Sequence, residues 1–369
     1  MKIQVQLRPL LKLQTSTWLD PFLLTGLLLL AGAGLFILGS ASNLNRHVVI
    51  AQASRFALGF ALLWVVSHIS PARLKLWTPW LYATSIMLVI VVLILGEGHG
   101  ASRWLNLGII RFQPSELLKL TTPMMLAWFL AARPLPPSWR DLGIAGVLIA
   151  LPAALIAKQP DLGTAVLVAV SGAFVIFLSG VSWKRMGLLL LVLMVAAPVA
   201  WHSMHAYQRQ RVQTMLNPES NPLGSGWHII QSEIAVGSGG VFGKGFLKGT
   251  QSQLEFLPEH TTDFIFAVVG EEFGLLGVLT LLALYGFIIW RSLWIAVHGH
   301  DTYARLLGGA LALSFFIYVV VNGGMISGLL PVVGVPLPLV SYGGTSAVTL
   351  LIGFGILMSI HAHRKLMPS

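Results

Sequence analysis

The stretch PFLLTGLLLLAGAGLFILG, residues 21–39, contains no charged side chain and is long enough to cross the hydrocarbon core of a bilayer as an α-helix. We place ten such apolar runs along the chain, at 20–39, 50–69, 77–96, 115–132, 142–158, 163–181, 185–201, 264–290, 303–322 and 341–361. A transmembrane β-barrel would instead show short segments of alternating polarity, and these runs are continuous. The sequence therefore predicts an all-α polytopic membrane protein with about ten transmembrane helices.

The composition of the 369-residue chain agrees with this prediction. Hydrophobic residues make up 56% of it, charged residues only 10%, and the mean hydropathy is +0.80. Soluble domains carry about 25% charged residues, so lipid must solvate most of this surface, and we expect one membrane domain over 1–369. Residues 1–19 and the first apolar run could imitate a cleaved signal peptide, but the run is longer than the usual signal core. We therefore expect a retained first helix.

The basic residues predict the orientation in the membrane. The net charge of +10 comes from short clusters between apolar runs, which membrane topology explains without a nucleic-acid partner. An even number of spans puts both termini on one side. That side holds 13 of the 23 basic residues: Lys2, Arg8, Lys12, Arg73, Lys75, Arg133, Arg140, Lys184, Arg185, Arg291, Arg305, Arg364 and Lys365. Both termini should be cytoplasmic, which makes 202–262 an extracytoplasmic loop with short interfacial helices.

Three polar or Gly/Pro-rich stretches, 97–119, 202–263 and 323–345, fall on the outer side and should gather on one face. In the first, Glu116 and Lys119 lie three residues apart, on one face of a helix that begins near Pro114. They are either a structural ion pair or a charged pair lining a site, because ionisable groups at membrane depth usually face a cavity.

Two further motifs admit both a structural and a functional interpretation. Asp161, in the run KQPDLGT at 158–164, either caps the following helix or serves the site. The glycine-rich run 237–249 contains Lys244 and Lys248, and flexible glycines can present backbone N–H groups to an anion such as pyrophosphate. An ordinary flexible turn is the alternative, and the spacing is not that of a P-loop.

Asp263 is the strongest catalytic candidate. It stands at the outer mouth of the eighth apolar run, where burial would favour the neutral acid, and a carboxylate so placed can act as a general base. The alternative is a helix N-cap. The irregular run 331–345, which contains Ser341, must be buried in protein or line a cavity. The chain has no cysteine, and its eleven histidines form no convincing metal set.

Together these runs resemble the SEDS family (shape, elongation, division and sporulation), and the chain is more similar to its elongation branch than to its division branch. The resemblance rests on QPSE at 113–116 with Lys119, KQPDLGT at 158–164, GSGG at 237–240 with GKG at 243–245, GTQSQLEFLPE at 249–259, TDFIFAV at 262–268 and PLPLVSYGG at 336–344. It covers essentially the whole chain.

The resemblance implies a peptidoglycan glycosyltransferase of cell elongation and rod shape that polymerises lipid II at the outer, periplasmic face of the bacterial inner membrane. It implies a class B penicillin-binding protein as partner, which supplies the transpeptidase. It makes Asp263 the essential acid, and Glu116 and Lys119 further functional charges. Substrate-binding candidates are Glu116, Lys119, Arg103, Arg111, Lys244, Lys248 and Ser341.

The chemistry of this reaction needs a base and positive charge. The donor sugar leaves undecaprenyl pyrophosphate with inversion, so one base must deprotonate the acceptor hydroxyl while cations stabilise the leaving group. A divalent cation, Mg²⁺ or Mn²⁺, could share that work, although the sequence shows no closed site for it. The rival hypothesis is a lipid II flippase, which should place its charges near the midplane rather than at the outer helix ends.

Overall fold

The structure is a computed structural model that describes residues 18–95, 104–106, 111–204, 206–218, 226–253 and 259–364. Ten long helices coincide with the ten predicted spans. They are α1 (Pro21–Ala41), α2 (Arg46–Ser67), α3 (Pro71–Leu95), α4 (Ser115–Ala131), α5 (Trp139–Lys158), α6 (Leu162–Leu178), α7 (Trp183–Ser203), α11 (Ile265–Val297), α12 (Thr302–Ile326) and α13 (Thr345–Ala362). The all-α prediction is confirmed. The largest boundary difference is at α11, which continues to Val297 rather than ending at 290.

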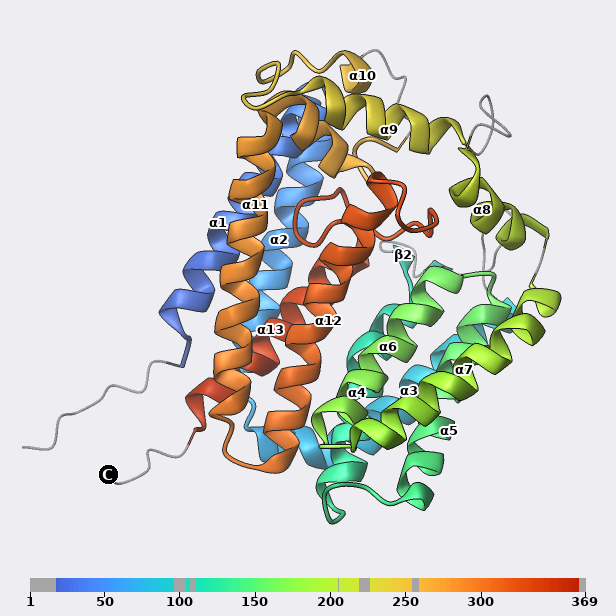
Figure 1. Ribbon diagram of the computed structural model, residues 1–369. Coiled ribbons are helices and arrows are strands. Elements are labelled where there is room, and N and C mark those ends of the chain that lie inside the picture. Colours follow the sequence, from blue (N-terminus) through green and yellow to red (C-terminus); the bar gives the residue numbers. More distant parts are fainter. Residues whose placement is uncertain are drawn as a thin grey trace, which may run out of the picture.

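Seven of these helices, α1, α2, α3, α5, α11, α12 and α13, are long and apolar enough to cross a membrane, and α6 is a shorter apolar helix. The most buried of the seven are α12 and α13. α12 packs against α4, α6, α11 and α13, so it stands at the centre of the bundle (Figure 1).

Polar and irregular segments collect at one end of the bundle, the upper end in Figure 1. There lie the short helices α8 (Ala206–Leu216), α9 (Trp227–Ser238) and α10 (Thr250–Gln253). The two-residue strands β1 (Leu105–Asn106) and β2 (Arg111–Phe112) pair antiparallel just before α4. Both described ends of the chain lie at the opposite end, where the ring of Trp18 meets that of His363 at 5.7 Å.

A buried ion pair holds α1 to α11 at that opposite end, beside α13. Asp20 caps α1 by accepting the Leu23 N–H at 2.7 Å, and its carboxylate also accepts the Arg291 Nε–H at 3.0 Å. His361 of α13 lies 3.5 Å from the same carboxylate. Since Asp20 is fully buried, these contacts satisfy a charge that would otherwise be costly.

Candidate functional site

Asp263 lies in a turn, residues 259–264, that is fastened to two other parts of the chain. The side-chain amide of Asn322 in α12 donates at 2.8 Å to the carbonyl of Asp263 and at 2.8 Å to that of Val335. The Tyr342 N–H donates to the Thr261 carbonyl at 2.8 Å. The turn is therefore held by α12 and by the irregular run 331–344.

The Asp263 carboxylate itself has no hydrogen-bond partner among the residues that the structure describes. It does not cap α11, whose N-cap is Phe264 and has no side-chain capping bond. It lies against Gly334, where an added Cβ would come within 3.4 Å of Oδ2. The geometry thus contradicts the N-cap alternative and leaves the carboxylate available for chemistry.

The surroundings of Asp263 favour its protonated form more than water does. Burial and the negative charge of Glu259 raise the pKa of Asp263 and Arg211 of α8 opposes them, so that the pKa of Asp263 is raised to about 6. At neutral pH the group is still mainly ionised, and it is a stronger base than an ordinary aspartate.

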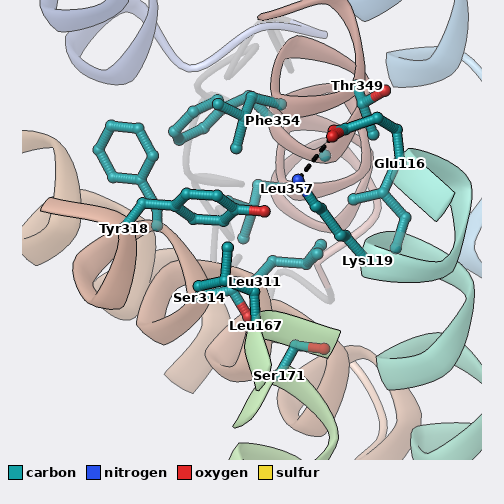
Figure 2. A pocket seen from close by; sticks show the side chains of 14 residues that line it. Glu116, Lys119, Leu167, Ser171, Leu311, Ser314, Tyr318, Thr349, Phe354 and Leu357 are labelled. Atoms are coloured by element: carbon teal, nitrogen blue, oxygen red, sulfur yellow. Dashed lines mark hydrogen bonds and ion pairs between the residues drawn. The ribbon is translucent and has the colours of Figure 1, made fainter. Parts of the chain in front are cut away.

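Glu116 and Lys119 form an ion pair with Nζ and Oε1 2.6 Å apart, as Figure 2 shows. Glu116 is only 5% exposed. The Lys119 ammonium also lies 5.2 Å from the centre of the Tyr318 ring of α12, close enough for a cation–π contact. The pair lines a cavity between α4, α6, α12 and α13 (Figure 2). Most of the other lining residues are apolar: Leu120, Leu167, Leu311, Phe315, Leu350, Phe354 and Leu357.

α12 connects this cavity to the Asp263 turn. Tyr318, which contacts Lys119, and Asn322, which holds Asp263, lie four residues apart and thus on one face of the helix, about 6 Å apart along its axis. Tyr318 also lines a second, smaller cavity, whose other walls include Leu337 and Ser341 of the irregular run. The charged cavity and the catalytic candidate therefore belong to one region of the molecule.

Ser341 lines the second cavity, but its hydroxyl already has partners. It donates to the Thr262 carbonyl and accepts the Leu337 N–H at 2.7 Å. Gln52 of α2 supports the same segment through the Ser341 carbonyl, at 3.2 Å. These bonds show Ser341 shaping the site, whereas its contact with substrate stays a prediction.

The glycine-rich run, residues 237–249, supplies backbone hydrogen bonds on both sides of a break in α11. Gly274 interrupts that helix with a φ of 62°. The carbonyls of Glu271 and Glu272 accept from Lys244 N–H at 3.0 Å and Gly245 N–H at 2.9 Å. The N–H groups of Leu275 and Leu276 donate back to residues 240 and 241 at 2.9 and 3.1 Å. The backbone groups that the break frees are thus satisfied by the run rather than by an anion.

The remaining predicted site residues lie in several places. Lys244 pairs with the buried Glu271, with Nζ and Oε1 2.7 Å apart, and Lys248 is exposed. Asp161 caps α6 by accepting the Thr164 N–H at 3.1 Å, as the structural alternative for this residue predicted. Arg103 lies outside the described residues, as does the side chain of Arg111. Their roles stay predictions.

Sequence reasoning missed Tyr318 and Asn322 and gave no site role to Arg211. Tyr318 and Asn322 sit inside an apolar run, where a lone tyrosine or asparagine gives no distinctive pattern. A polar amide at the end of a transmembrane run was the one available signal, since such groups need buried partners. No group of three His, Cys, Asp or Glu residues within the described part of the chain could hold a metal ion.

The chain is similar to a known protein family and to several named proteins. The chain matches the family model FTSW_RODA_SPOVE, described as cell cycle protein, over residues 14–366. It is 52% identical over 351 residues to the peptidoglycan glycosyltransferase MrdB of Escherichia coli K12, covering 95% of each chain. To MrdB of Helicobacter pylori J99 it is 38% identical, covering 85% of this chain and 83% of the relative.

Two solved structures are similar over most of their length. One belongs to work on the structural coordination of polymerization and crosslinking by a peptidoglycan synthase complex; it is 32% identical, with a TM-score of 0.82, and the match covers 94% of this chain and 99% of that one. The other is the crystal structure of the Thermus thermophilus rod shape determining protein RodA, 31% identical with a TM-score of 0.72, where the match covers 94% and 97%.

Proposed function

The chain belongs to the FtsW/RodA/SpoVE family of cell cycle proteins, and from this premise we propose how it works as a peptidoglycan glycosyltransferase: Asp263 is the general base that activates the acceptor sugar of lipid II. The observation that carries the proposal is the Asp263 carboxylate, which is partly buried, has a raised pKa and has no hydrogen-bond partner among the described residues. The resemblance to named glycosyltransferases argues against the flippase hypothesis.

The proposed step is an inverting transfer. Asp263 takes the proton from the acceptor hydroxyl, the hydroxyl oxygen bonds to the anomeric carbon of the donor sugar, and the bond from that carbon to the lipid pyrophosphate breaks. A base with a pKa close to the working pH suits this role, because it is ionised yet still accepts a proton readily.

Glu116 and Lys119 are proposed to serve the lipid-linked end of the substrate. The cavity that they line is charged beside the pair and mostly apolar elsewhere, which matches a polyprenyl pyrophosphate. The Lys119 ammonium would stabilise pyrophosphate charge, and Glu116 would hold that ammonium in place. Lys248, Arg103 and Arg111 are candidates for the same task, and Lys244 is a weaker one because Glu271 already pairs with it.

The protein is a membrane protein, and we propose that it resides in the bacterial inner membrane with its termini cytoplasmic and Asp263 facing the periplasm. The basic residues on the side of the termini support this orientation. We further propose a class B penicillin-binding protein as partner, which the likeness to a chain from a peptidoglycan synthase complex supports.

The test is Asp263→Asn in a lipid II polymerisation assay with the full-length protein. The amide keeps the size of the side chain but cannot accept the proton, so glycan formation should fall by at least about 10²-fold. Asp301→Asn is the matched control: Asp301 caps α12 at the end of the bundle where the described ends of the chain lie, and its loss should leave the rate near wild type. A wild-type rate for the Asp263 variant would overturn the mechanism.

A further inference from the structure

His228 lies beside the Asp263 turn, and the proposed mechanism gives it no role. It belongs to the first turn of α9, the helix that crosses the outer end of the bundle (Figure 1). The imidazole of His228 stacks on the phenyl ring of Phe264, with ring centroids 5.8 Å apart and planes inclined at 16°. Phe264 follows Asp263 directly in the chain, so the stack holds the imidazole against the residue that adjoins the catalytic candidate.

The same two charges act on His228 and on Asp263. Burial lowers the pKa of His228, Glu259 opposes this effect, and Arg211 lowers the pKa further. Glu259 and Arg211 also shift the pKa of Asp263, so His228 and Asp263 border one polar region. Since an unperturbed histidine titrates near 6.5, His228 is neutral at pH 7, where Asp263 is ionised.

The environment of the ring also selects one tautomer. Nδ1 is buried and has no hydrogen-bond partner in the part of the chain that the structure describes. A neutral imidazole carries its proton on one nitrogen only. A buried donor left without a partner is rarer in proteins than an acceptor in the same position, so the proton belongs on Nε2.

We propose that His228 is a substrate-binding residue whose Nε2–H donates a hydrogen bond to a hydroxyl or amide oxygen of the sugar held at Asp263. A neutral donor suits an uncharged sugar, and the stack on Phe264 directs the bond. This inference rests on the proposed function, because it needs a sugar in front of Asp263.

The test replaces His228 with three side chains in the full-length protein, assayed on lipid II with the partner transpeptidase present. Phenylalanine keeps the stack and removes both nitrogens. Glutamine places an amide N–H where Nε2 stood, and asparagine places one where Nδ1 stood. We expect His228→Phe to raise KM for lipid II roughly three- to tenfold, with little change in kcat. The KM of His228→Gln should be close to that of the wild type. The KM of His228→Asn should stay as high as that of the Phe variant.

The KM readout separates binding from folding, because a smaller fraction of folded enzyme lowers kcat but leaves KM unchanged. His47→Phe, at an exposed position at the outer end of α2, is the control for introducing the ring. An unchanged KM in the Phe variant, or a KM restored by asparagine, would overturn the proposal. Should the Phe variant fail to fold, the comparison of Gln with Asn decides alone. Asp263→Asn in the same assay tests the base separately, so the two failures are distinguishable.

Discussion

At the scale of single residues, the site depends on a carboxylate whose basicity is set by its neighbours. Burial has the largest influence on the pKa of Asp263, and Glu259 and Arg211 shift this pKa in opposite directions. The sequence places an acid at this position, but the strength of that acid depends on a loop residue and on a residue of α8.

We predict an acid limb near pH 6 in the pH dependence of kcat/KM. Only the ionised carboxylate accepts a proton, so the rate should rise with pH through about 6 and level off above it. A limb at the ordinary aspartate value near 4 would contradict the proposed burial of the group.

We predict that two neighbouring charges move this limb in opposite directions. Glu259→Gln removes a charge that raises the pKa of Asp263, so the limb should move to lower pH. Arg211→Gln removes a charge that lowers the pKa, so the limb should move to higher pH. Arg46→Gln, at an exposed position at the outer end of α2, should leave it in place. Shifts of the same sign in the first two variants would disprove this electrostatic account.

At the scale of elements, the break in α11 and the glycine-rich run form one unit. The run approaches α11 so closely that a Cβ on Gly243 would lie 2.1 Å from the Glu272 carbonyl oxygen. Gly243 also has a φ of 77°, which L side chains rarely adopt. The glycine-rich run, whose sequence suggested anion binding, thus forms backbone hydrogen bonds with α11. These bonds let α11 continue across its break.

We predict opposite effects for two glycine substitutions in this region. Gly243→Ala should destabilise the protein by at least about 1 kcal/mol, from the backbone conformation alone, and the contact with α11 adds to this cost. Gly237→Ala meets no atom within 4 Å and lies in α9, where alanine is favoured by about 0.5–1 kcal/mol. Thermal unfolding in detergent measures both. Equal stability of the two variants would show that the run does not close the break.

At the scale of the whole molecule, one buried ion pair joins α1, the first transmembrane helix, to α11 near the other end of the chain. Asp20→Asn leaves Arg291 without its carboxylate, and breaking such a pair costs about 3–5 kcal/mol. We predict a clear loss of thermal stability. Lys75→Ala is the control: the Lys75–Asp301 pair is 4.0 Å long and more than a third exposed, so its loss should cost at most about 1 kcal/mol. A similar loss in both variants would contradict a special role for Asp20.

The orientation of the whole molecule is testable because the chain has no cysteine of its own. We predict that Lys248→Cys reacts with a membrane-impermeant maleimide in intact spheroplasts. Lys184→Cys, at the start of α7, should react only after permeabilisation. The reverse pattern would place Asp263 on the cytoplasmic side and exclude periplasmic catalysis.

The helices and the main acid could be predicted from the sequence because the signals are local. Each apolar run carries its own tendency to cross a bilayer, whatever the rest of the chain does. Asp263 was recognisable because it stands directly before one of these runs. Family membership was recognisable for a related reason, since its motifs are short continuous stretches.

The partners of these residues were decided by the tertiary structure alone. Lys244 meets Glu271 across 27 positions, and Asn322 meets Asp263 across 59. Such pairs depend on how helices pack and on which buried polar groups still need a hydrogen bond, and hydropathy along the chain carries neither kind of information. The sequence by itself therefore determined a membrane glycosyltransferase with a candidate base. Only the packing of α12 against α4 and the outer turn brought the charged cavity beside that base, because a hydrogen bond forms only where the fold brings donor and acceptor together.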